Sequence, residues 1–165
     1  MAQNDQALLT RLKNSGLEFV VIGGVCAVYH GAALATFDLD ICCRFNEDNV
    51  KRIESAMSDL HPVHRLTANK LPLEMTRQSF GDLKNLYLQT DLGRLDCLGE
   101  VSGIGSYDEV LKRSVLARFS YGDFRHLDLD ALIASKEAAS REKDLYALRL
   151  LRGIKEKNEQ QKNLL

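Results

Sequence analysis

The sequence lacks the features that mark several broad classes of protein. Its 165 residues carry a net charge of −1, which does not suggest a strongly basic nucleic-acid-binding protein but leaves room for a local basic groove. No apolar run is long enough to span a bilayer. The first residues, MAQNDQ, include no positively charged segment before an apolar one. We therefore expect no signal peptide, no membrane partner and a cytoplasmic location.

Paired cysteine motifs are also missing. The four cysteines form no CxxC pair, and none lies near a histidine at the spacing of a zinc site: Cys26, Cys42, Cys43 and Cys97. All four lie in apolar stretches of the sequence. We expect buried, reduced thiols rather than zinc or redox chemistry.

The composition is that of an ordinary globular chain. Hydrophobic residues make up 45% and charged residues 27% of the sequence, and its length suits one domain with a real core. We find no repeat, no low-complexity segment and no interdomain linker. The sequence therefore predicts a single domain over residues 1–165, with its core roughly within 17–152.

Hydrophobic periodicity and turn residues predict helices and strands in mixed order. Helices are expected over residues 4–15, 24–31, 46–60, 107–114, 128–140 and 141–157. Strands are expected over residues 18–22, 37–43, 85–90, 94–98, 115–120 and 124–127, with a further short strand around 71–76. The polar tail, KEKNEQQKNLL, is expected to fray. This order predicts an α+β (mixed α/β) fold, with a small mixed sheet flanked by helices and helices at the C-terminus.

Gly23 and Gly24 stand where a predicted strand turns into a predicted helix. Glycine allows a sharp turn and a close approach of the backbone to a ligand. The free N–H groups and the dipole of the following helix favour phosphate. Glycine is also common in such turns for geometry alone, so this pair does not by itself establish a phosphate site.

Asp38 and Asp40 interrupt an otherwise apolar predicted strand. Residues i and i+2 of a strand share a face, so the two carboxylates converge while Phe37, Leu39 and Ile41 point into a core. Two buried carboxylates repel each other unless a cation lies between them, and Mg²⁺ prefers oxygen ligands. The alternative is an exposed edge strand that carries two acidic residues.

A third carboxylate, Asp96, lies in another apolar predicted strand, GRLDCL. If this strand pairs beside the one that holds Asp38 and Asp40, three carboxylates could hold two metal ions. That arrangement serves in-line phosphoryl or nucleotidyl transfer. Spacing alone does not show that the two strands are neighbours.

Three segments in order resemble the nucleotidyltransferases of the DNA-polymerase-β-like superfamily: VIGGVCAVYHGAALATFDLDI, GRLDCL and LDLDALIASKEAASREKDLYALRLL. The group that looks most similar is that of minimal nucleotidyltransferases and abortive-infection toxins, with the pattern G-G-x-A-(x)3-H-G-(x)2-R-x-T-x-D-x-D. The chain matches it at Gly23, Gly24, His30, Gly31, Thr36, Asp38 and Asp40, and Ala27 stands one place from the pattern's alanine. The resemblance covers roughly residues 17–152 and implies the nucleotidyltransferase fold.

The resemblance also implies a function and a set of roles. Such an enzyme moves a nucleoside monophosphate from an NTP, most simply ATP, to a hydroxyl on a small molecule, protein or RNA, and it uses two Mg²⁺ ions. The implied metal ligands and catalytic residues are Asp38, Asp40 and Asp96, the last of which would help deprotonate the acceptor hydroxyl. The implied nucleotide-binding residues are Gly23, Gly24, Thr36, Lys136, Arg141 and Lys143. A cognate antitoxin-like protein is a further implied partner.

Two departures from the family pattern keep a second function open. Val25 stands where many members have a serine that binds phosphate, and Leu34 stands where the pattern has arginine. These changes would suit a catalytically impaired module that binds a nucleotide or a partner protein. A third reading, a D-x-D glycosyltransferase, would need a nucleotide-sugar domain that this length hardly accommodates.

The remaining polar candidates have simpler explanations. His30 is expected to cap or pack a helix, and Asp128 and Asp130 to cap and open the helix that follows them. Asp144 is expected to pair with a neighbouring helix. Lys136, Arg141 and Lys143 could also form a solvated helix face, supported by a Glu137–Arg141 pair. No histidine has the context of a catalytic triad.

Overall fold

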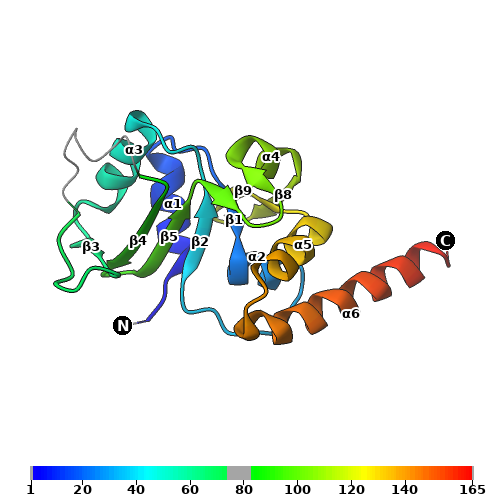
Figure 1. Ribbon diagram of the computed structural model, residues 1–165. Coiled ribbons are helices and arrows are strands. Elements are labelled where there is room, and N and C mark those ends of the chain that lie inside the picture. The colour runs from blue at the N-terminus through cyan, green and yellow to red at the C-terminus, as the bar shows by residue number, and fades with distance from the viewer. Residues whose placement is uncertain (1, 74–82, 165) are drawn as a thin grey trace.

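The structure is a computed structural model that describes residues 2–73 and 83–164 (Figure 1). The described helices are α1 (Asp5–Asn14), α2 (Gly23–Tyr29), α3 (Glu47–Met57), α4 (Tyr107–Lys112), α5 (Leu129–Ala139), the 3-10 helix η2 (Glu142–Asp144) and α6 (Leu145–Lys162). The described strands are β1 (Val20–Ile22), β2 (Leu39–Cys42), β3 (Val63–His64), β4 (Asn85–Thr90), β5 (Gly93–Leu98), β6 (Glu100–Val101), β7 (Gly105–Ser106), β8 (Ser114–Phe119) and β9 (Gly122–Leu127). The predicted mixed α+β fold is confirmed.

Seven strands form one mixed sheet in the order β3-β4-β5-β2-β1-β9-β8. β1 runs antiparallel to β2 and parallel to β9, and β2 runs parallel to β5. The two outer hairpins, β4–β5 and β8–β9, are the ones that the turn residues predicted. β6 and β7 form a separate two-stranded ribbon. The central strands therefore come from three distant parts of the chain.

The helices form where amphipathic periodicity and caps predict them. Leu8, Leu9 and Leu12 of α1 are fully buried, and Asn4 caps this helix by accepting a hydrogen bond from the backbone N–H of Ala7. Asn46 caps α3 in the same way. α1 and α3 pack against each other, so both helices bury their apolar faces on the core.

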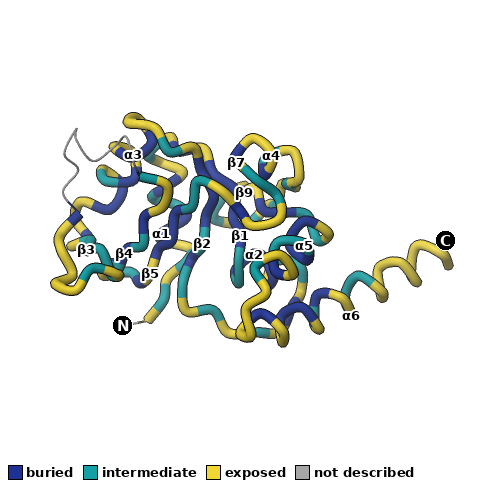
Figure 2. The backbone as a smooth tube through the Cα atoms, in the orientation of Figure 1, coloured by how far each residue is buried: buried dark blue, intermediate teal, exposed yellow. Residues whose placement is uncertain are grey.

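α2 and α5 pack together beside the sheet, and the start of α6 packs on both (Figure 1). Beyond Leu151, which is fully buried, α6 leaves the body of the protein and most of its residues are exposed (Figure 2). No helix within 2–73 and 83–164 combines the length and the apolar character needed to cross a membrane.

The prediction of a frayed tail from residue 155 is wrong for most of that segment, because α6 continues to Lys162. Lys, Glu and Gln are good helix formers, so the polar composition favours a solvated helix there. Lys155 also holds the helix to α5 through an ion pair with Asp130, at 2.8 Å between Nζ and Oδ1.

Two strand predictions also change. β2 begins at Leu39, so Phe37 lies in the preceding bend and is 73% exposed, whereas Leu39 and Ile41 are fully buried as expected. Phe37 therefore does not point into the core. Of the strand expected around 71–76, only a bridge between Pro72 and Val63 is found, and residues 74–76 lie outside the described residues.

Candidate active site

Three carboxylates gather at one end of the central strands. Asp40 in β2 and Asp96 in β5 are direct partners in the parallel pair, so their side chains lie on the same face of the sheet. Asp38 lies in the bend that leads into β2. One carboxylate oxygen from each of the three residues lies within 4.8 Å of the other two. The parallel pairing makes β2 and β5 neighbours in the sheet, which the spacing of the residues in the sequence could not show.

The cluster is electrostatically unfavourable as it stands. Burial raises the pKa of Asp40 to about 7, and the negative charges of Asp38 and Asp96 add to this rise. Burial also raises the pKa of Asp96, although a hydrogen bond from Arg65 opposes the change. A divalent cation among these oxygens would relieve the repulsion.

The raised pKa of Asp40 predicts a stability that falls as pH rises. Between about pH 4 and pH 7 the folded protein binds a proton at Asp40 that the unfolded chain has already released. The free energy of unfolding should therefore drop by roughly 2–3 kcal/mol between about pH 5 and pH 8 in the absence of metal. Mg²⁺ should stabilise the protein more at pH 8 than at pH 5, because protons compete with the ion. Urea unfolding with and without Mg²⁺ measures both effects.

An Asp40→Asn variant isolates this contribution. The comparison is needed because burial lowers the pKa of His126, which makes stability rise with pH up to about 6.5 and so opposes the effect of Asp40. The difference between wild type and variant should grow with pH through about 7. A difference that does not change with pH would contradict the assignment.

Gly23 forms the turn between β1 and α2 directly beside the carboxylates. Its φ is +66°, and a Cβ built on it would lie 2.0 Å from Oδ2 of Asp40. Only glycine allows both the left-handed backbone and this close approach. No side chain caps the start of α2, whose N-cap residue is Ile22, so the first N–H groups of the helix have no side-chain partner.

Gly24 and Thr36 lie against each other at the same end of the cleft. A Cβ on Gly24 would lie 3.0 Å from Cγ2 of Thr36 and 3.9 Å from a methyl carbon of Leu34. Leu34 lines the cleft, whereas Val25 is only 4% exposed and belongs to the core. A side chain at position 25 thus packs inward, while position 34 offers an apolar surface to whatever the cleft holds.

The three carboxylates line a cleft of about 720 Å³. All residues to which the sequence assigned a site role lie on its wall: Gly23, Gly24, Thr36, Asp38, Asp40, Asp96, Lys136, Arg141 and Lys143. Arg65 and Arg94 add two further cations to the lining. The cleft therefore places an acidic cluster next to a wall rich in positive charge.

The side chains of Lys136 and Arg141 both form ion pairs with the carboxylate of Asp144. The distances are 2.9 Å from Nζ of Lys136 to Oδ1 and 2.6 Å from Nε of Arg141 to Oδ2. Burial alone would raise the pKa of Asp144, but these two hydrogen bonds outweigh it and hold the pKa below its usual range. Asp144 thus pairs with α5, as expected. Among the described residues no ion pair involves Lys143.

Arg65 is a site residue that sequence reasoning missed. It follows β3, and its backbone N–H donates to the carbonyl oxygen of Tyr87 at 2.9 Å. Its Nη2 donates to Oδ2 of Asp96, and its guanidinium lies 5.5 Å from the centre of the Tyr87 ring. Nε of Arg65 and Oδ1 of Asp96 are buried without a hydrogen-bond partner among the described residues. No motif signals Arg65, because only the pairing of β3 with β4 brings it to the cleft.

The mouth of the cleft is apolar. Phe37, Leu66 and Tyr146 line it and are 73%, 66% and 62% exposed. Sequence reasoning assigned none of them to the site, and Phe37 was expected in the core. Large exposed apolar side chains around a polar cleft suit contact with a ligand.

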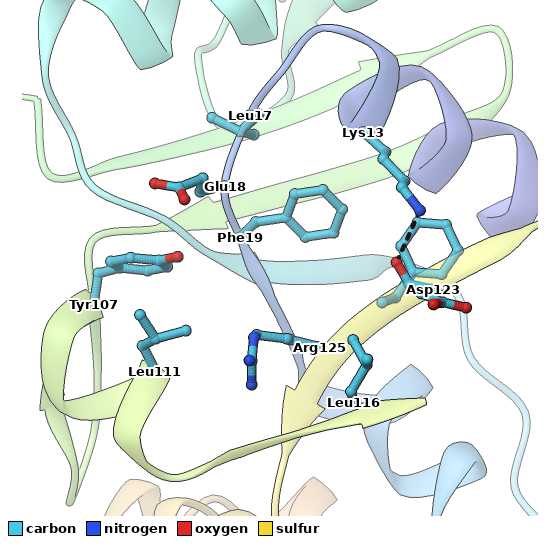
Figure 3. Close-up of a pocket in the computed structure, with 10 residues that line it drawn as sticks. Lys13, Leu17, Glu18, Phe19, Tyr107, Leu111, Leu116, Asp123 and Arg125 are labelled. Carbon is cyan, nitrogen blue, oxygen red and sulfur yellow. Dashed lines mark hydrogen bonds between the residues drawn. The ribbon is translucent and has the colours of Figure 1, made fainter. Parts of the chain in front are cut away.

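A second pocket, of about 460 Å³, lies between α1, α4 and β9 (Figure 3). Leu17, Phe19 and Leu111 give it apolar walls, and Lys13 Nζ donates to the backbone oxygen of Asp123 at 3.2 Å. It contains none of the three clustered carboxylates. We therefore assign the chemistry to the cleft.

The remaining sequence predictions divide between confirmation and correction. Asp128 caps α5 by accepting from the N–H of Ala131 at 2.6 Å, and Asp130 lies in the first turn, as expected. The predicted pairing of Glu137 with Arg141 is wrong, because α5 ends at Ala139. Glu137 instead accepts a hydrogen bond from Arg152 of α6 at 2.6 Å.

Solved structures share this fold at low sequence identity. A protein from Thermotoga maritima that is provisionally described as a nucleotidyltransferase has a TM-score of 0.56 and 18% identity, with 86% of each chain covered. ANT(2″)-Ia in complex with adenylyl-2″-tobramycin has a TM-score of 0.56 and 13% identity, covering 88% of this chain and 83% of the other. The solution structure of the antibiotic-resistance factor ANT(2″)-Ia gives a TM-score of 0.54 and 14% identity over 88% and 78%.

No protein-family model and no curated protein matches the sequence. The structural matches cover most of this chain and more than three quarters of each matched chain. The chain therefore has the nucleotidyltransferase fold, as the resemblance in its sequence predicted.

Proposed function

We propose that this chain, which has the fold of nucleotidyltransferases, transfers a nucleoside monophosphate from an NTP, most simply ATP, to a hydroxyl acceptor with the help of two Mg²⁺ ions. The observation that carries the proposal is the convergence of Asp38, Asp40 and Asp96 in a cleft whose other wall is cationic. The ANT(2″)-Ia complex contains an adenylylated compound, which supports an adenylyl group as cargo for this fold.

The three carboxylates fit Mg²⁺. Their donor atoms are all oxygens that lie within 4.8 Å of one another. Oδ1 of Asp96 is buried and has no hydrogen-bond partner within residues 2–73 and 83–164. Burial raises the pKa of Asp40 to about 7, and the charges of Asp38 and Asp96 add to a rise that a bound cation would oppose. When bound, Mg²⁺ neutralises the phosphate oxygens and stabilises charge on the attacking and leaving oxygens.

The cationic wall and the glycine turn would hold the triphosphate. The uncapped N–H groups of the turn at Gly23 and Gly24 donate hydrogen bonds, and Lys136 and Lys143 add positive charge nearby. The ion pair with Asp144 holds Lys136 and Arg141 in place before the nucleotide arrives. Phe37 and Tyr146 offer aromatic surface to the base at the mouth of the cleft.

Asp96 is the residue placed to take the proton of the acceptor. The acceptor oxygen forms a bond to the α-phosphorus, the bond from that phosphorus to pyrophosphate breaks, and the proton of the hydroxyl passes to the carboxylate of Asp96. Arg65 holds the other oxygen of Asp96 and so fixes the orientation of the carboxylate. Catalysis rests mainly on positioning and charge neutralisation.

Replacing Arg65 should change how the rate depends on pH. Arg65→Gln removes the cation that opposes the raised pKa of Asp96, so that pKa should rise further. The acid limb of the rate profile should then move to higher pH, by about one pH unit. Steady-state rates between about pH 5 and pH 9 measure the shift.

Arg94→Gln is the matched control. Arg94 lines the same cleft, but its Nε donates to Gln89, at 3.4 Å, and not to Asp96. The acid limb of the rate profile of Arg94→Gln should coincide with that of the wild type. Equal acid limbs in Arg65→Gln and Arg94→Gln would remove Arg65 from this role.

A binding module without turnover is the second candidate function, and Leu34 is the observation that favours it. Its apolar side chain faces the cleft where the family pattern has arginine. The cations already on the wall offset this loss in our account. Calorimetry separates the two functions, because a module would bind NTP and Mg²⁺ tightly and release no pyrophosphate in the presence of any acceptor.

Label transfer tests the proposed function. The protein is incubated with α-labelled NTPs, Mg²⁺ and acceptors from three classes, namely small polyols, proteins and RNA. We expect acceptor labelling with release of pyrophosphate, and loss of both in Asp38→Ala. Equal labelling by wild type and Asp38→Ala would overturn the assignment.

A further inference from the structure

We propose that Cys26, His30 and His126 form a second metal site, suited to Zn²⁺ and separate from the three carboxylates. One ligand atom from each lies within 4.8 Å of the other two, and these are the nitrogen and sulfur ligands that zinc prefers. The carboxylate cluster offers only oxygen. The inference does not depend on nucleotidyl transfer.

The fold brings the three residues together from two elements. Cys26 lies in α2 and His30 is its C-cap, so they stand one helical turn apart on one side of the helix. His126 lies in β9 and is the register partner of Val21 in β1, the strand that leads into α2. No zinc motif is visible in the sequence because His126 stands 100 residues after Cys26.

The distances suit a small tetrahedral ion. Sγ of Cys26 lies 3.8 Å from Nδ1 of His126 and 3.5 Å from the carbonyl oxygen of Leu127. Nε2 of His30 and Nδ1 of His126 lie 2.8 and 3.0 Å from the same oxygen. Zinc bonds of about 2.0–2.3 Å imply separations of roughly 3.4–3.6 Å between ligand atoms. Small side-chain shifts would therefore suffice, and the fourth position is open to this carbonyl oxygen or to water.

Three potential hydrogen-bond donors share one acceptor in this cluster. The thiol of Cys26, Nε2 of His30 and Nδ1 of His126 all converge on the carbonyl oxygen of Leu127, which has two lone pairs. If either ring nitrogen were unprotonated, its lone pair would face that oxygen. A cation replaces the converging protons and lets the sulfur and both nitrogens use their lone pairs together.

Two of the three ligands lie inside the protein. Cys26 is fully buried and His126 is 6% exposed. Cys42, Cys43 and Cys97 are equally buried, but within the described residues they belong to no such cluster. His30 is partly exposed and provides the route of entry.

A metal here would tie α2 to β9 behind the glycine turn. Gly23 and Gly24 begin α2, and two of the three ligands, Cys26 and His30, lie in this helix and at its end. A bound ion would therefore fix the direction in which this helix meets the cleft. It would also stabilise the folded chain, because the unfolded chain cannot bring residues 26 and 126 together without cost.

Cobalt titration tests the site. The metal-free full-length protein is titrated with Co²⁺ in excess Mg²⁺, which occupies the carboxylates. We expect one equivalent to produce a thiolate-to-cobalt charge-transfer band and strong tetrahedral d–d bands, both removed by one equivalent of Zn²⁺. Cys26→Ala should lose the charge-transfer band, and His30→Gln should bind Zn²⁺ at least roughly tenfold more weakly.

Cys43→Ala and Asp38→Asn are the controls, and both should keep the full cobalt spectrum. His30 is partly exposed, so His30→Gln keeps the test decisive if Cys26→Ala does not fold. A wild type with no thiolate band at one equivalent would overturn the proposal. A band that survives in both Cys26→Ala and His30→Gln, or cobalt binding that only Asp38→Asn removes, would overturn it as well.

Discussion

Asp40→Asn is expected to abolish transfer and, at the same time, to stabilise the metal-free protein. The amide keeps the shape of the side chain but removes a charge that is proposed to bind Mg²⁺, so the rate should fall by about 10³-fold or more, equivalent to about 4 kcal/mol in the activation free energy. Burial and two neighbouring carboxylates raise the pKa of Asp40 to about 7. Removing its charge should therefore raise the free energy of unfolding by roughly 2–4 kcal/mol at about pH 8.

Label transfer and urea unfolding measure the two effects on the same preparation. Asp48→Asn is the matched control, because Asp48 is exposed in the first turn of α3, away from the cleft. It should change transfer little and stability by less than about 1 kcal/mol. An Asp40→Asn protein that loses both activity and stability would show that the carboxylate supports the fold rather than a metal.

Gly23→Ala should damage both activity and stability. The new Cβ would meet three atoms of the Asp40 side chain, at 2.0, 2.7 and 2.9 Å, so the carboxylate must move by about an ångström or more. A displacement of this size at a reacting centre costs about 10²-fold in rate. The left-handed backbone and the overpacking together should lower the free energy of unfolding by roughly 2–4 kcal/mol.

Gly31→Ala separates backbone strain from the clash. Gly31 has a φ of +99°, but a Cβ there would meet nothing within 4 Å. This variant should lose roughly 1–2 kcal/mol of stability and keep its transfer rate. If Gly23→Ala and Gly31→Ala lose the same stability and both keep activity, Gly23 does not hold the backbone against Asp40 as described.

The local parts of the fold follow from the sequence. Caps such as Asn4, Asn46 and Asp128 act on their own first turns, and leucines at helical spacing mark α1, so neighbours along the chain carry the information. Gly23, Gly24, Asp38 and Asp40 could be singled out for the same reason, because polar groups or glycines stand out in an apolar stretch, and all four line the cleft.

The features that the sequence could not predict depend on pairing between strands that lie far apart in the sequence. Asp40 and Asp96 meet because β2 and β5 pair in parallel, and Arg65 meets Asp96 because β3 adds to β4. Such register is set by tertiary packing rather than by local pattern. Phe37 was misplaced because the predicted strand was started at Phe37, before β2 begins at Leu39. The grouping of His126 with Cys26 and His30 likewise depends on the pairing of β1 with β9, which is distant in the sequence.

The two departures from the family pattern have different weights in the structure. Val25 is buried in the core and does not line the cleft, so a side chain at this position packs away from it. Leu34 does line the cleft, and its apolar side chain lies at the end formed by Gly24. The question of catalytic competence therefore concerns Leu34 more than Val25, and Leu34→Arg should tighten NTP binding if that end holds phosphate.

A crystal structure with Mg²⁺ and a non-hydrolysable ATP analogue tests the central claim most directly. Our account predicts two ions bound by Asp38, Asp40 and Asp96, with the triphosphate between the glycine turn and Lys136 and Lys143. It also predicts that Oδ1 of Asp96 contacts an ion. A nucleotide bound outside the cleft, or ions that leave Asp96 uncoordinated, would contradict it.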